Sequence, residues 1–454
     1  MGGDSQPAQS RPVSDRRVIV LGGGLAGLTA ALDCAEAGAR VSLLEVRPRL
    51  GGAAYSFQRD GLWLDNGQHV FLRCCTAYRA LLTRLGSERH VRIQPRLQIP
   101  VLSPRSRPTV LRRSGLPAPF HLAGTLARYP HLTILQRLRA TWAALALARL
   151  DQGGACEQER VKGLTLGGWL AEHGQSPAAV TALWDLIALP TLNLPAAEGS
   201  LELGAFVLRK GLLESRDAGD IGFHMRPLSE ILGEPASRAL ARAGVSVSLG
   251  ARAERVLHGE RGMWVQAGDL ELEADAVICA IPHERAAALL EPLLGAETAR
   301  WSRLGRSPIV NLHVVYDRRV CGLPFAAGVG TPVQYLFDRT AAAGLDAGQY
   351  LAVSLSGAER ERDCPLEQLR ERYTGALQEL FPAARDATVR SFYVSREHAA
   401  TFRAGPGVQA LRPGARTGIR GLVLAGAWTD TGWPATLEGA VLSGHSAARE
   451  ALAA

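Results

Sequence analysis

The chain has 454 residues, of which 47% are hydrophobic and 49 are glycine, and it carries a formal net charge of +8. This length is enough for two domains with sizeable cores, and the balanced composition is typical of a soluble α/β protein. No run reaches about 18 uninterrupted apolar residues, which disfavours a membrane-spanning helix. The polar stretch Met1–Ser14 lacks the apolar core of a signal peptide. We therefore expect the chain to fold in the cytosol.

A dinucleotide-binding unit is predicted at the beginning of the chain. The strand Val18–Leu21 leads into the glycine turn Gly22–Gly27, an alanine-rich helix to about Gly38 and a second strand, Val41–Leu44, which ends on Glu45. In this pattern the glycines allow a tight turn, the approach of a pyrophosphate and close helix–strand packing, while the helix N-terminus faces the phosphates. A carboxylate at position 45 can accept hydrogen bonds from both ribose hydroxyls and would repel a 2′-phosphate.

A hairpin and a long helical region are predicted next. Tyr55–Phe57 and Leu62–Leu64 flank a turn at Asp60-Gly61, which is typical of a β-hairpin. From about 91 to 235 the chain is predicted to be mostly helical, with several proline breaks.

This middle region is strongly basic. Between Glu88 and Asp151 there is no acidic residue. The stretch contains arginine at positions 89, 92, 96, 105, 107, 112, 113, 128, 137, 139 and 149. It matches no nucleic-acid-binding motif, so we expect no nucleic-acid partner. Attraction to an anionic lipid surface is our hypothesis, with membrane contact near 115–150. A solvated arginine-rich face is the alternative.

The remaining segments predict a discontinuous domain. Strands are expected at Val245–Leu249, Arg255–His258, Met263–Ala267, Ala276–Ala280, Ile309–Tyr316, Tyr350–Ser356 and Gly421–Ala425, and helices at about Leu366–Leu380 and Leu437–Leu452. We predict an α/β fold whose Rossmann-like FAD-binding domain comprises 16–90, 236–300 and 410–454. An inserted α+β substrate-binding domain would comprise 91–235 and 301–409.

The cysteines predict neither a metal site nor a disulfide framework. The seven are scattered at positions 34, 74, 75, 156, 279, 321 and 364, without CxxC or metal-ligand spacing. We expect reduced, structural thiols. A redox-active Cys74-Cys75 pair is the alternative.

Further motifs resemble the flavin amine oxidase and carotenoid (phytoene) desaturase superfamily. Glu45–Gly52 is similar to the superfamily's extended motif, and Leu424–Trp428 and Pro434–Ala440 resemble its closing segment. The resemblance covers the whole chain and implies FAD, with the last helix directing its N-terminus at the pyrimidine side of the flavin. The fingerprint and the resemblance together assign to the cofactor Gly22, Gly24, Leu25, Ala26, Gly27, Glu45, Val46, Arg47, Arg49, Gly51, Gly52, Asn66, Gly67, Val256, Gly426, Ala427, Pro434, Thr436 and Leu437.

Two positions depart from the superfamily pattern. Ala53 stands where arginine usually follows the glycine pair, and Ala427 stands where an acidic residue usually bonds a ribityl hydroxyl. We expect these departures to weaken FAD binding without changing the cofactor. Asp430 or a water could take the place of the missing acid.

The branch of the superfamily is indicated by two features. Amine oxidases commonly carry a lysine on the strand that corresponds to Ile309–His313, and here that strand has none. Asp65–Val70, together with Trp428–Thr436 and Leu192–Pro195, resembles the hydroxysqualene dehydroxylase family, also called squalene-associated FAD-dependent desaturases. The resemblance implies reduction of hydroxysqualene to squalene, in squalene and hopanoid biosynthesis, with hydride from reduced FAD.

The expected chemistry needs an acid and an apolar cavity. A protonated allylic hydroxyl leaves as water, and the cation accepts hydride. His69 is our candidate proton donor, Asp65 would orient it or act instead, and Gln68 completes the predicted catalytic group. The alternative is that these side chains only satisfy backbone groups of a tight turn. Trp184, Phe206, Asn311, His313 and Trp433 are the candidate substrate residues, and Glu438 is a further possible cavity residue.

Substrate and partners follow from solubility. A C30 isoprenoid such as hydroxysqualene should arrive from a bilayer, so we expect a cytoplasmic protein peripherally associated with the inner face of the cell membrane. The electron donor that reduces the flavin is not identified by the sequence. A carotenoid-type desaturase or isomerase is the first alternative function, and a non-catalytic FAD-binding scaffold for prenyl-lipid synthases is the second.

Overall fold

The computed structural model of the chain describes residues 15–150, 155–260 and 262–453. The polar stretch Met1–Ser14 therefore lies outside the described residues, as does the side chain of Cys156. The six cysteines of the described part are free thiols. In these ranges no helix combines the length and the apolarity that are needed to cross a membrane.

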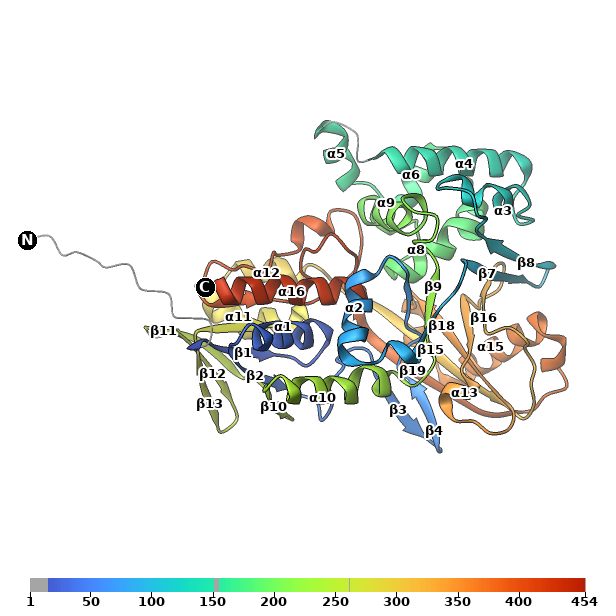
Figure 1. Cartoon of the computed structure of the whole chain (residues 1–454). Helices are drawn as coiled ribbons and strands as arrows, with labels where there is room; N and C mark the ends of the chain where they lie inside the picture. Colours follow the sequence, from blue (N-terminus) through green and yellow to red (C-terminus); the bar gives the residue numbers. More distant parts are fainter. Residues whose placement is uncertain (1–14, 151–154, 261, 454) are drawn as a thin grey trace, which may run out of the picture.

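A five-stranded parallel sheet forms one half of the molecule (Figure 1). In spatial order its strands are β10 (Ser246–Leu249), β2 (Arg40–Glu45), β1 (Arg17–Leu21), β14 (Ala276–Cys279) and β20 (Leu422–Leu424). Alternation along β1 explains why both faces are covered. Val18 and Val20 pack with the helices α1 (Leu25–Glu36), α2 (Thr76–Leu85), α10 (Glu234–Arg242) and α16 (Leu437–Ala453). Ile19 and Leu21 belong to the core on the opposite face.

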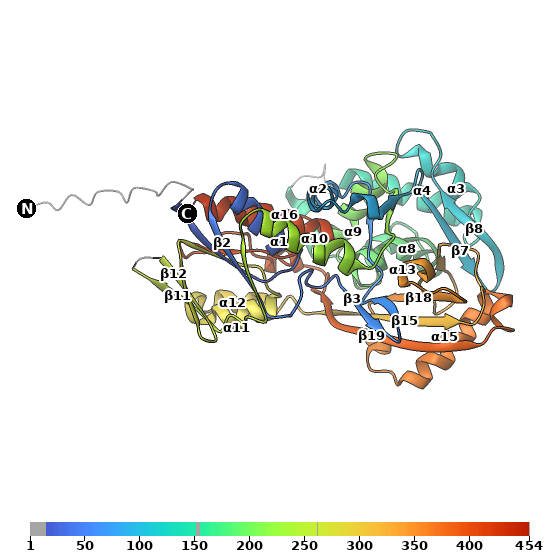
Figure 2. The same cartoon turned by 60° about the horizontal axis from the view of Figure 1, so that its bottom comes forward.

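An antiparallel layer and two helices share that opposite core. They are β11 (Arg255–Gly259), β12 (Gly262–Ala267), β13 (Leu270–Ala274), α11 (His283–Leu294) and α12 (Glu297–Ser302). Figure 2 shows this layer below the parallel sheet, with α1, α10 and α16 above it.

A seven-stranded mixed sheet forms the other half. In order its strands are β19 (Val389–Thr401), β15 (Ser307–Tyr316), β18 (Gln349–Ser356), β17 (Tyr335–Asp338), β16 (Phe325–Gly328), β7 (Gln98–Ser103) and β8 (Ser106–Arg112). Val310, Leu312 and Val314 of β15 join the core under α15 (Leu366–Leu380). Asn311 and His313 therefore face the opposite side, toward the cofactor half. Short helices α13 (Thr340–Ala343) and α14 (Glu359–Arg362) complete this half.

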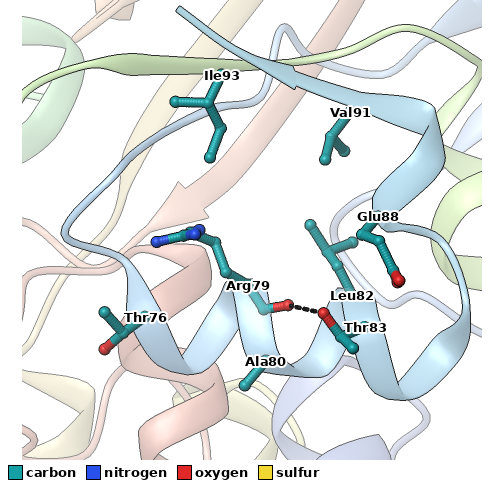
Figure 3. Close-up of a pocket in the computed structure, with 8 residues that line it drawn as sticks. All are labelled: Thr76, Arg79, Ala80, Leu82, Thr83, Glu88, Val91 and Ile93. Atoms are coloured by element: carbon teal, nitrogen blue, oxygen red, sulfur yellow. Dashed lines mark hydrogen bonds between the residues drawn. The ribbon is translucent and has the colours of Figure 1, made fainter. Parts of the chain in front are cut away.

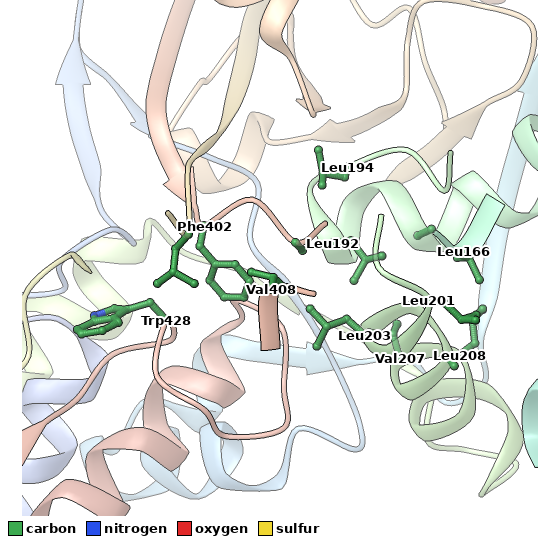
Figure 4. Close-up of a cluster of buried hydrophobic side chains, with 14 of the residues drawn as sticks. Leu166, Leu192, Leu194, Leu201, Leu203, Val207, Leu208, Phe402, Val408 and Trp428 are labelled. Atoms are coloured by element: carbon green, nitrogen blue, oxygen red, sulfur yellow. The ribbon is translucent and has the colours of Figure 1, made fainter. Parts of the chain in front are cut away.

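Small β-elements and a helical layer join the halves. The strands are the hairpin β3 (Ser56–Arg59) with β4 (Leu62–Asp65), and the sheet of β5 (Val70–Leu72), β9 (Ile221–His224) and β6 (Val91–Ile93). The helices are α3 (Ala123–Ala127), α4 (Ile134–Arg149), α5 (Ala155–Lys162), α6 (Leu166–Glu172), α7 (Pro177–Ala179), α8 (Asp185–Leu192) and α9 (Leu201–Leu208). Leucines of α6, α8 and α9 meet Phe402 and Trp428 of the C-terminal region in one core (Figure 4).

The predicted elements of the cofactor half are confirmed, and the prediction for 91–235 was wrong in part. That region contains the strands β6, β7, β8 and β9 as well as helices. The strand β6 pairs with β9, more than 100 residues later, and such distant pairing leaves little trace in local sequence. The strands β7 and β8 form a local hairpin that the helical prediction missed. We keep the discontinuous division into two domains as a proposal with one change: Leu228, Ile231 and Leu232 pack in the core beneath α1, so the second cofactor segment begins before 236.

Candidate active site

The glycine turn and the second glycine pair face one another. Gly22 has φ +105°, and a Cβ at Gly27 would lie 1.9 Å from the carbonyl oxygen of Gly22. A Cβ at Gly52 would lie 2.7 Å from the Cα of Gly24. The amide of Gly51 also donates to the carbonyl of Gly23 (2.9 Å). This approach, possible only for glycine, leaves backbone amides at the N-terminus of α1 open to a phosphate group. Leu25 and Ala26 are the first residues of that helix.

Glu45 organises the end of β2. Its Oε2 accepts a hydrogen bond from the amide of Gly23 (2.6 Å) and its Oε1 accepts one from the amide of Arg47 (2.7 Å). Each carboxylate oxygen keeps a second lone pair for a ribose hydroxyl. The amide of Ala251 donates to the carbonyl of Glu45 (3.0 Å), which brings the segment leading to Val256 beside the site. Val256 itself is buried and paired with Val265 on β12.

Arg49 has an unsatisfied donor beside the glycine pair. Its Nη1 donates to the carbonyl of Gly52 (3.1 Å), and its Cζ lies 3.5 Å from the centre of the Tyr55 ring. Its Nη2 is buried without a hydrogen-bond partner. Burial, and then the charge of Arg47, lower the pKa of Arg49. A negatively charged group at this place would pair with the free Nη2. Val46, the neighbour of Arg47, is exposed.

Arg412 braces the C-terminal segment of the site. Its buried guanidinium donates to the carbonyls of Ala427 (3.3 Å), Trp428 (3.3 Å) and Thr429. Burial lowers the pKa of Arg412 to about 10. Gly426, with φ +134°, donates its amide to Ser443 of α16 (2.9 Å). The loop is thereby held against the parallel sheet and α16.

The start of α16 is built from the other predicted C-terminal residues. The hydroxyl of Thr436 donates to the carbonyl of Pro434 (3.2 Å) and accepts from the amide of Gly439 (3.1 Å), so Thr436 caps the helix that begins at Leu437. Glu438 is not a cavity residue, because its carboxylate accepts from the amides of Ala77 (3.0 Å) and Tyr78 (2.7 Å). It therefore caps α2.

His69 lies against the carbonyl of Gly67, with its Nδ1 3.0 Å from that oxygen. A carbonyl can only accept, so Nδ1 carries the proton and Nε2 is the nitrogen available to a ligand. Burial lowers the pKa of His69 below its ordinary value, and the contact with Gly67 and the charge of Asp65 partly oppose this. The side chain is therefore neutral at pH 7 and a stronger acid whenever it is protonated.

Asn66 and Gly67 hold this turn in place. The Nδ2 of Asn66 donates to the carbonyl of Ala53 (2.9 Å) and to Glu397 (2.9 Å), and its Oδ1 accepts from the amide of Tyr55 (3.2 Å). These bonds connect the turn to the second glycine pair and to β19. Asn66 therefore positions the turn, and its side chain is not free for a cofactor.

Asp65 is a structural residue in this arrangement. One oxygen accepts from Ser56 (2.6 Å) and the amide of Leu228 (3.1 Å), and the other forms an ion pair with Arg339 (2.7 Å). Both oxygens are occupied and the side chain is buried. These contacts contradict a role as proton donor, and they position the turn that carries His69.

Two orphaned polar atoms flank that turn. The Nε2 of Gln68 and the Oδ1 of Asn311 are buried without a hydrogen-bond partner. Asn311 donates its Nδ2 to the carbonyl of Asn66 (2.9 Å), and a Cβ at Gly67 would lie 3.6 Å from this nitrogen and 3.4 Å from Cε1 of His69. His69 and Asn311 therefore approach the same point from the turn and from β15. A donor and an acceptor that lack partners indicate a place for a polar ligand group.

The substrate candidates divide into two groups. Phe206 of α9 and Trp433 meet edge to face, with 5.1 Å between ring centroids. His313 is fully buried, with its ring nitrogens on Tyr350 (2.6 Å) and Ser395 (3.1 Å). Trp184 is a buried core residue whose Nε1 donates to Gln175 (3.1 Å). The predictions for His313 and Trp184 were therefore wrong.

A surface pocket of about 480 Å³ lies elsewhere, between α2 and β6 (Figure 3). It is lined by Thr76, Arg79, Ala80, Leu82, Thr83, Glu88, Val91 and Ile93. None of the predicted site residues lines it, so it is separate from the glycine cradle.

Comparison with known proteins identifies the fold and the cofactor class. A model of flavin containing amine oxidoreductases matches residues 25–452. The chain belongs to this family. A hydroxysqualene dehydroxylase of Rhodopseudomonas palustris is 31% identical over 97% of this chain and 99% of its own length, and one of Sinorhizobium fredii is 31% identical over 96% and 98%. A 15-cis-phytoene desaturase of Solanum lycopersicum is 25% identical over 97% of this chain and 78% of its own length. The resemblance stated from the sequence is confirmed.

The solved structures agree with the family. Putrescine oxidase bound to putrescine superposes with a TM-score of 0.71 at 20% identity, covering 97% of this chain and 99% of the other. The protein is therefore a flavoenzyme with the Rossmann-like fold of the amine oxidase family. The glycine cradle and the unpaired Nη2 of Arg49 fit the phosphates of a flavin nucleotide.

Several residues that shape the site carry no signal in the sequence. Arg339, Glu397 and Arg412 act through partners at least 15 residues away along the chain, and the chain has other arginines and glutamates without such roles. Asp430 is exposed and its Oδ1 accepts from the amide of Gly432 (3.2 Å). Its replacement of the missing acid at 427 stays a prediction. Both lysines form surface ion pairs, Lys162 with Glu159 and Lys210 with Glu214.

Proposed function

We propose that this flavoenzyme uses FAD to reduce hydroxysqualene to squalene. The observation that carries the proposal is full-length similarity to two hydroxysqualene dehydroxylases at 31% identity. The turn Asp65–His69 supports it, because His69 and Asn311 both lie beside Gly67 and two amide atoms, the Nε2 of Gln68 and the Oδ1 of Asn311, lack hydrogen-bond partners.

We propose FAD as the form of the flavin, because the site offers partners for a pyrophosphate and for a ribose. The amides at the N-terminus of α1 and the Nη2 of Arg49 would hold the pyrophosphate, and Glu45 would hold the ribose of the adenosine part. Arg49 thereby offers the positive charge that Ala53 cannot provide. The loop Gly426–Ala427 and the N-terminus of α16 would lie at the flavin ring, where the helix dipole stabilises negative charge. When bound and reduced, FAD supplies the hydride.

His69 is the residue that we propose as proton donor. Its protonated Nε2 would give a proton to the hydroxyl of hydroxysqualene, so that the C–O bond breaks and water leaves. The vacated carbon then accepts the hydride, which yields squalene and water. Gln68 and Asn311 would hold the hydroxyl group and the departing water through Nε2 and Oδ1. Phe206 and Trp433 would provide an apolar wall that excludes water and faces the cation with π-electrons.

The alternatives have less support. The tomato phytoene desaturase is 25% identical and only 78% covered, below the values for the dehydroxylases. A non-catalytic FAD-binding scaffold would also keep the glycine cradle, but it conflicts with membership of an enzyme family. The same proposal includes a partner that delivers electrons to the flavin. It also includes peripheral association with the inner face of the cell membrane, from the cytoplasmic side.

The direct test is a single turnover without oxygen. The purified flavoenzyme is photoreduced and mixed with detergent-dispersed hydroxysqualene, and the flavin spectrum and extracted lipids are followed. We expect flavin oxidation with one squalene formed per flavin. Oxidised flavin without squalene, or no reaction at all, would sink the proposal. The same enzyme, oxidised and given phytoene, tests desaturation.

A further inference from the structure

The most exposed apolar side chains gather in one region. Among the described residues, six large apolar side chains are more than half exposed, and all lie between 116 and 142. They are Leu116 (54%), Phe120 (61%), Ile134 (74%), Leu135 (55%), Leu138 (64%) and Trp142 (65%). We call these six the 116–142 apolar surface. Exposed apolar side chains in such concentration mark a contact surface more often than an ordinary face of a protein.

Four of the six lie on one side of a well-formed helix. Ile134, Leu135, Leu138 and Trp142 follow the spacing of a single face of α4. Its opposite side is also apolar, since Ala140, Ala143 and Leu147 are buried in the main core. Thr133 and Gln136 form a capping box at the N-terminus of α4, so the exposed face belongs to a regular helix with a fixed start. Only its buried side is needed for packing within the chain.

The surroundings of this surface are positively charged. No acidic residue occurs between Glu88 and Asp151. Exposed arginines in the stretch are Arg89, Arg92, Arg96, Arg105, Arg107, Arg112, Arg128, Arg139 and Arg149, and the last six of these lie between 105 and 149, as the apolar surface does. The helix α3 packs against both β8 and α4, and these elements lie at the end of the molecule opposite β11 and β12 (Figures 1 and 2).

Two arginines of the stretch have other functions. The buried Arg113 forms an ion pair with Asp220 (2.6 Å). Arg137 donates to the carbonyls of Ala127 (2.6 Å), Tyr129 (3.0 Å) and Leu132 (3.0 Å). Replacing either would disturb folding, so neither can test docking.

We propose that the 116–142 apolar surface docks on an anionic lipid bilayer. Leu138 and Trp142 would enter the boundary between headgroups and acyl chains, and the exposed arginines would contact lipid phosphates. A second copy of the chain is a poorer occupant, because two basic surfaces repel each other. The inference rests on the proposed function only for the purpose of docking, which is the uptake of a water-insoluble substrate from the bilayer.

The fold connects this surface with the candidate active site. The helix α4 contacts α9, and α9 carries Phe206, whose ring meets Trp433. A molecule that leaves the bilayer beside α4 would therefore reach the aromatic pair across one layer of helices.

The test is co-sedimentation of the holoenzyme with vesicles of phosphatidylcholine, alone or mixed with an equal amount of phosphatidylglycerol. We expect binding mainly to the mixed vesicles. The double variant Leu138→Ser, Trp142→Ser should bind at least about tenfold more weakly, and Arg112→Gln, Arg128→Gln should lose about fivefold per arginine. The matched control is Leu257→Ser, Trp264→Ser, a cross-strand pair on β11 and β12 with 44% and 37% exposure, which should bind like wild type.

Two outcomes would overturn the inference. One is undiminished vesicle binding by the Leu138, Trp142 variant. The other is a wild type that ignores both vesicles but forms a dimer, or binds a purified protein, in a way that the variant abolishes. Turnover of detergent-dispersed hydroxysqualene tests the proposed function separately from docking. The Leu138, Trp142 variant should retain this turnover. Absence of turnover in wild type would refute dehydroxylation and would leave vesicle binding intact.

Discussion

His69 combines a fixed tautomer with a depressed basicity. The carbonyl of Gly67 holds the proton on Nδ1, and burial lowers the pKa of the ring. Above that pKa the protonated fraction rises about tenfold for each unit by which the pH falls. An enzyme that uses this imidazolium as its acid is therefore faster at lower pH, as long as it remains folded.

The replacement His69→Gln should lower the single-turnover rate of hydroxysqualene reduction by about 10²–10⁴-fold, the usual contribution of a positioned acid. It should also remove the rise in rate between pH 8 and pH 6.5 that wild type shows (on the order of tenfold per unit). Flavin content should not change. The control is His258→Gln, which is exposed on β11. A His69→Gln enzyme with the wild-type rate and pH profile would show that the proton comes from elsewhere.

Close backbone approach makes elements interdependent. The helix α16 crosses α1 so closely that a Cβ at Gly444 would lie 2.4 Å from the carbonyl of Ala26. The loop after β2 likewise presses Gly52 against Gly24. Each contact is between backbones, so no side-chain movement can relieve an added methyl group.

The substitution Gly52→Ala tests this at the cofactor cradle. Position 52 has φ +59° and its Cβ would lie 2.7 Å from Gly24. We expect flavin affinity to fall at least about a hundredfold, and the free energy of unfolding to fall by about 1–3 kcal/mol from backbone strain. Flavin titration and urea unfolding measure the two effects.

The matched control is Gly375→Ala in α15, where an added Cβ meets nothing within 4 Å. It should leave flavin binding unchanged and raise the free energy of unfolding by about 0.5–1 kcal/mol, because alanine is the better helix former. Equal flavin affinity in the two variants would contradict the cradle geometry.

The sequence predicts elements well where the signal is local. The turn Gly22–Gly27, the hairpin around Asp60-Gly61 and the last helix all combine periodicity with glycine positions. It fails where a distant partner decides the outcome. Asp65 was predicted to be catalytic, but it pairs with Arg339, which lies 274 residues away along the chain. His313 was predicted to contact substrate, but its ring nitrogens contact Tyr350 and Ser395. Strand β6 likewise depends on a distant partner, β9, which its own residues do not reveal.

At the scale of the whole molecule, buried neutral histidines limit stability in acid. Burial lowers the pKa of His224 and of His313 to about 3. The ordinary value in an unfolded chain is about 6.5. Below pH 6.5 the unfolded state therefore binds protons that the native state excludes, and the free energy of unfolding falls as the pH falls toward 3.

Each of these two histidines, His224 and His313, should lower the free energy of unfolding by about 1.4 kcal/mol between pH 7.5 and pH 5.5. The raised pKa values of the buried carboxyl groups of Glu202 and Glu438 act in the opposite direction, so the prediction concerns a difference between variants. In His313→Gln the pH-dependent loss, measured by urea unfolding, should be smaller by about 1.4 kcal/mol than in wild type, although the variant is less stable at both pH values. In the control variant His258→Gln, which changes an exposed side chain, the pH-dependent loss should match that of wild type. An unchanged loss in His313→Gln would mean that this ring takes up protons in the native state as it does in the unfolded chain.

The order of the strands in the parallel sheet also determines when the cofactor-binding half can complete its folding. The edge strand β20 and the helix α16 come from the last 33 residues of the chain, yet they complete the layer that covers β1 and α1 from the first 36. The nascent chain must therefore keep α1 without its partner until α16 has been synthesised. A chain that stops before β20 would lack this edge strand and the helix that packs on α1, so we expect it to bind flavin more weakly than the full chain.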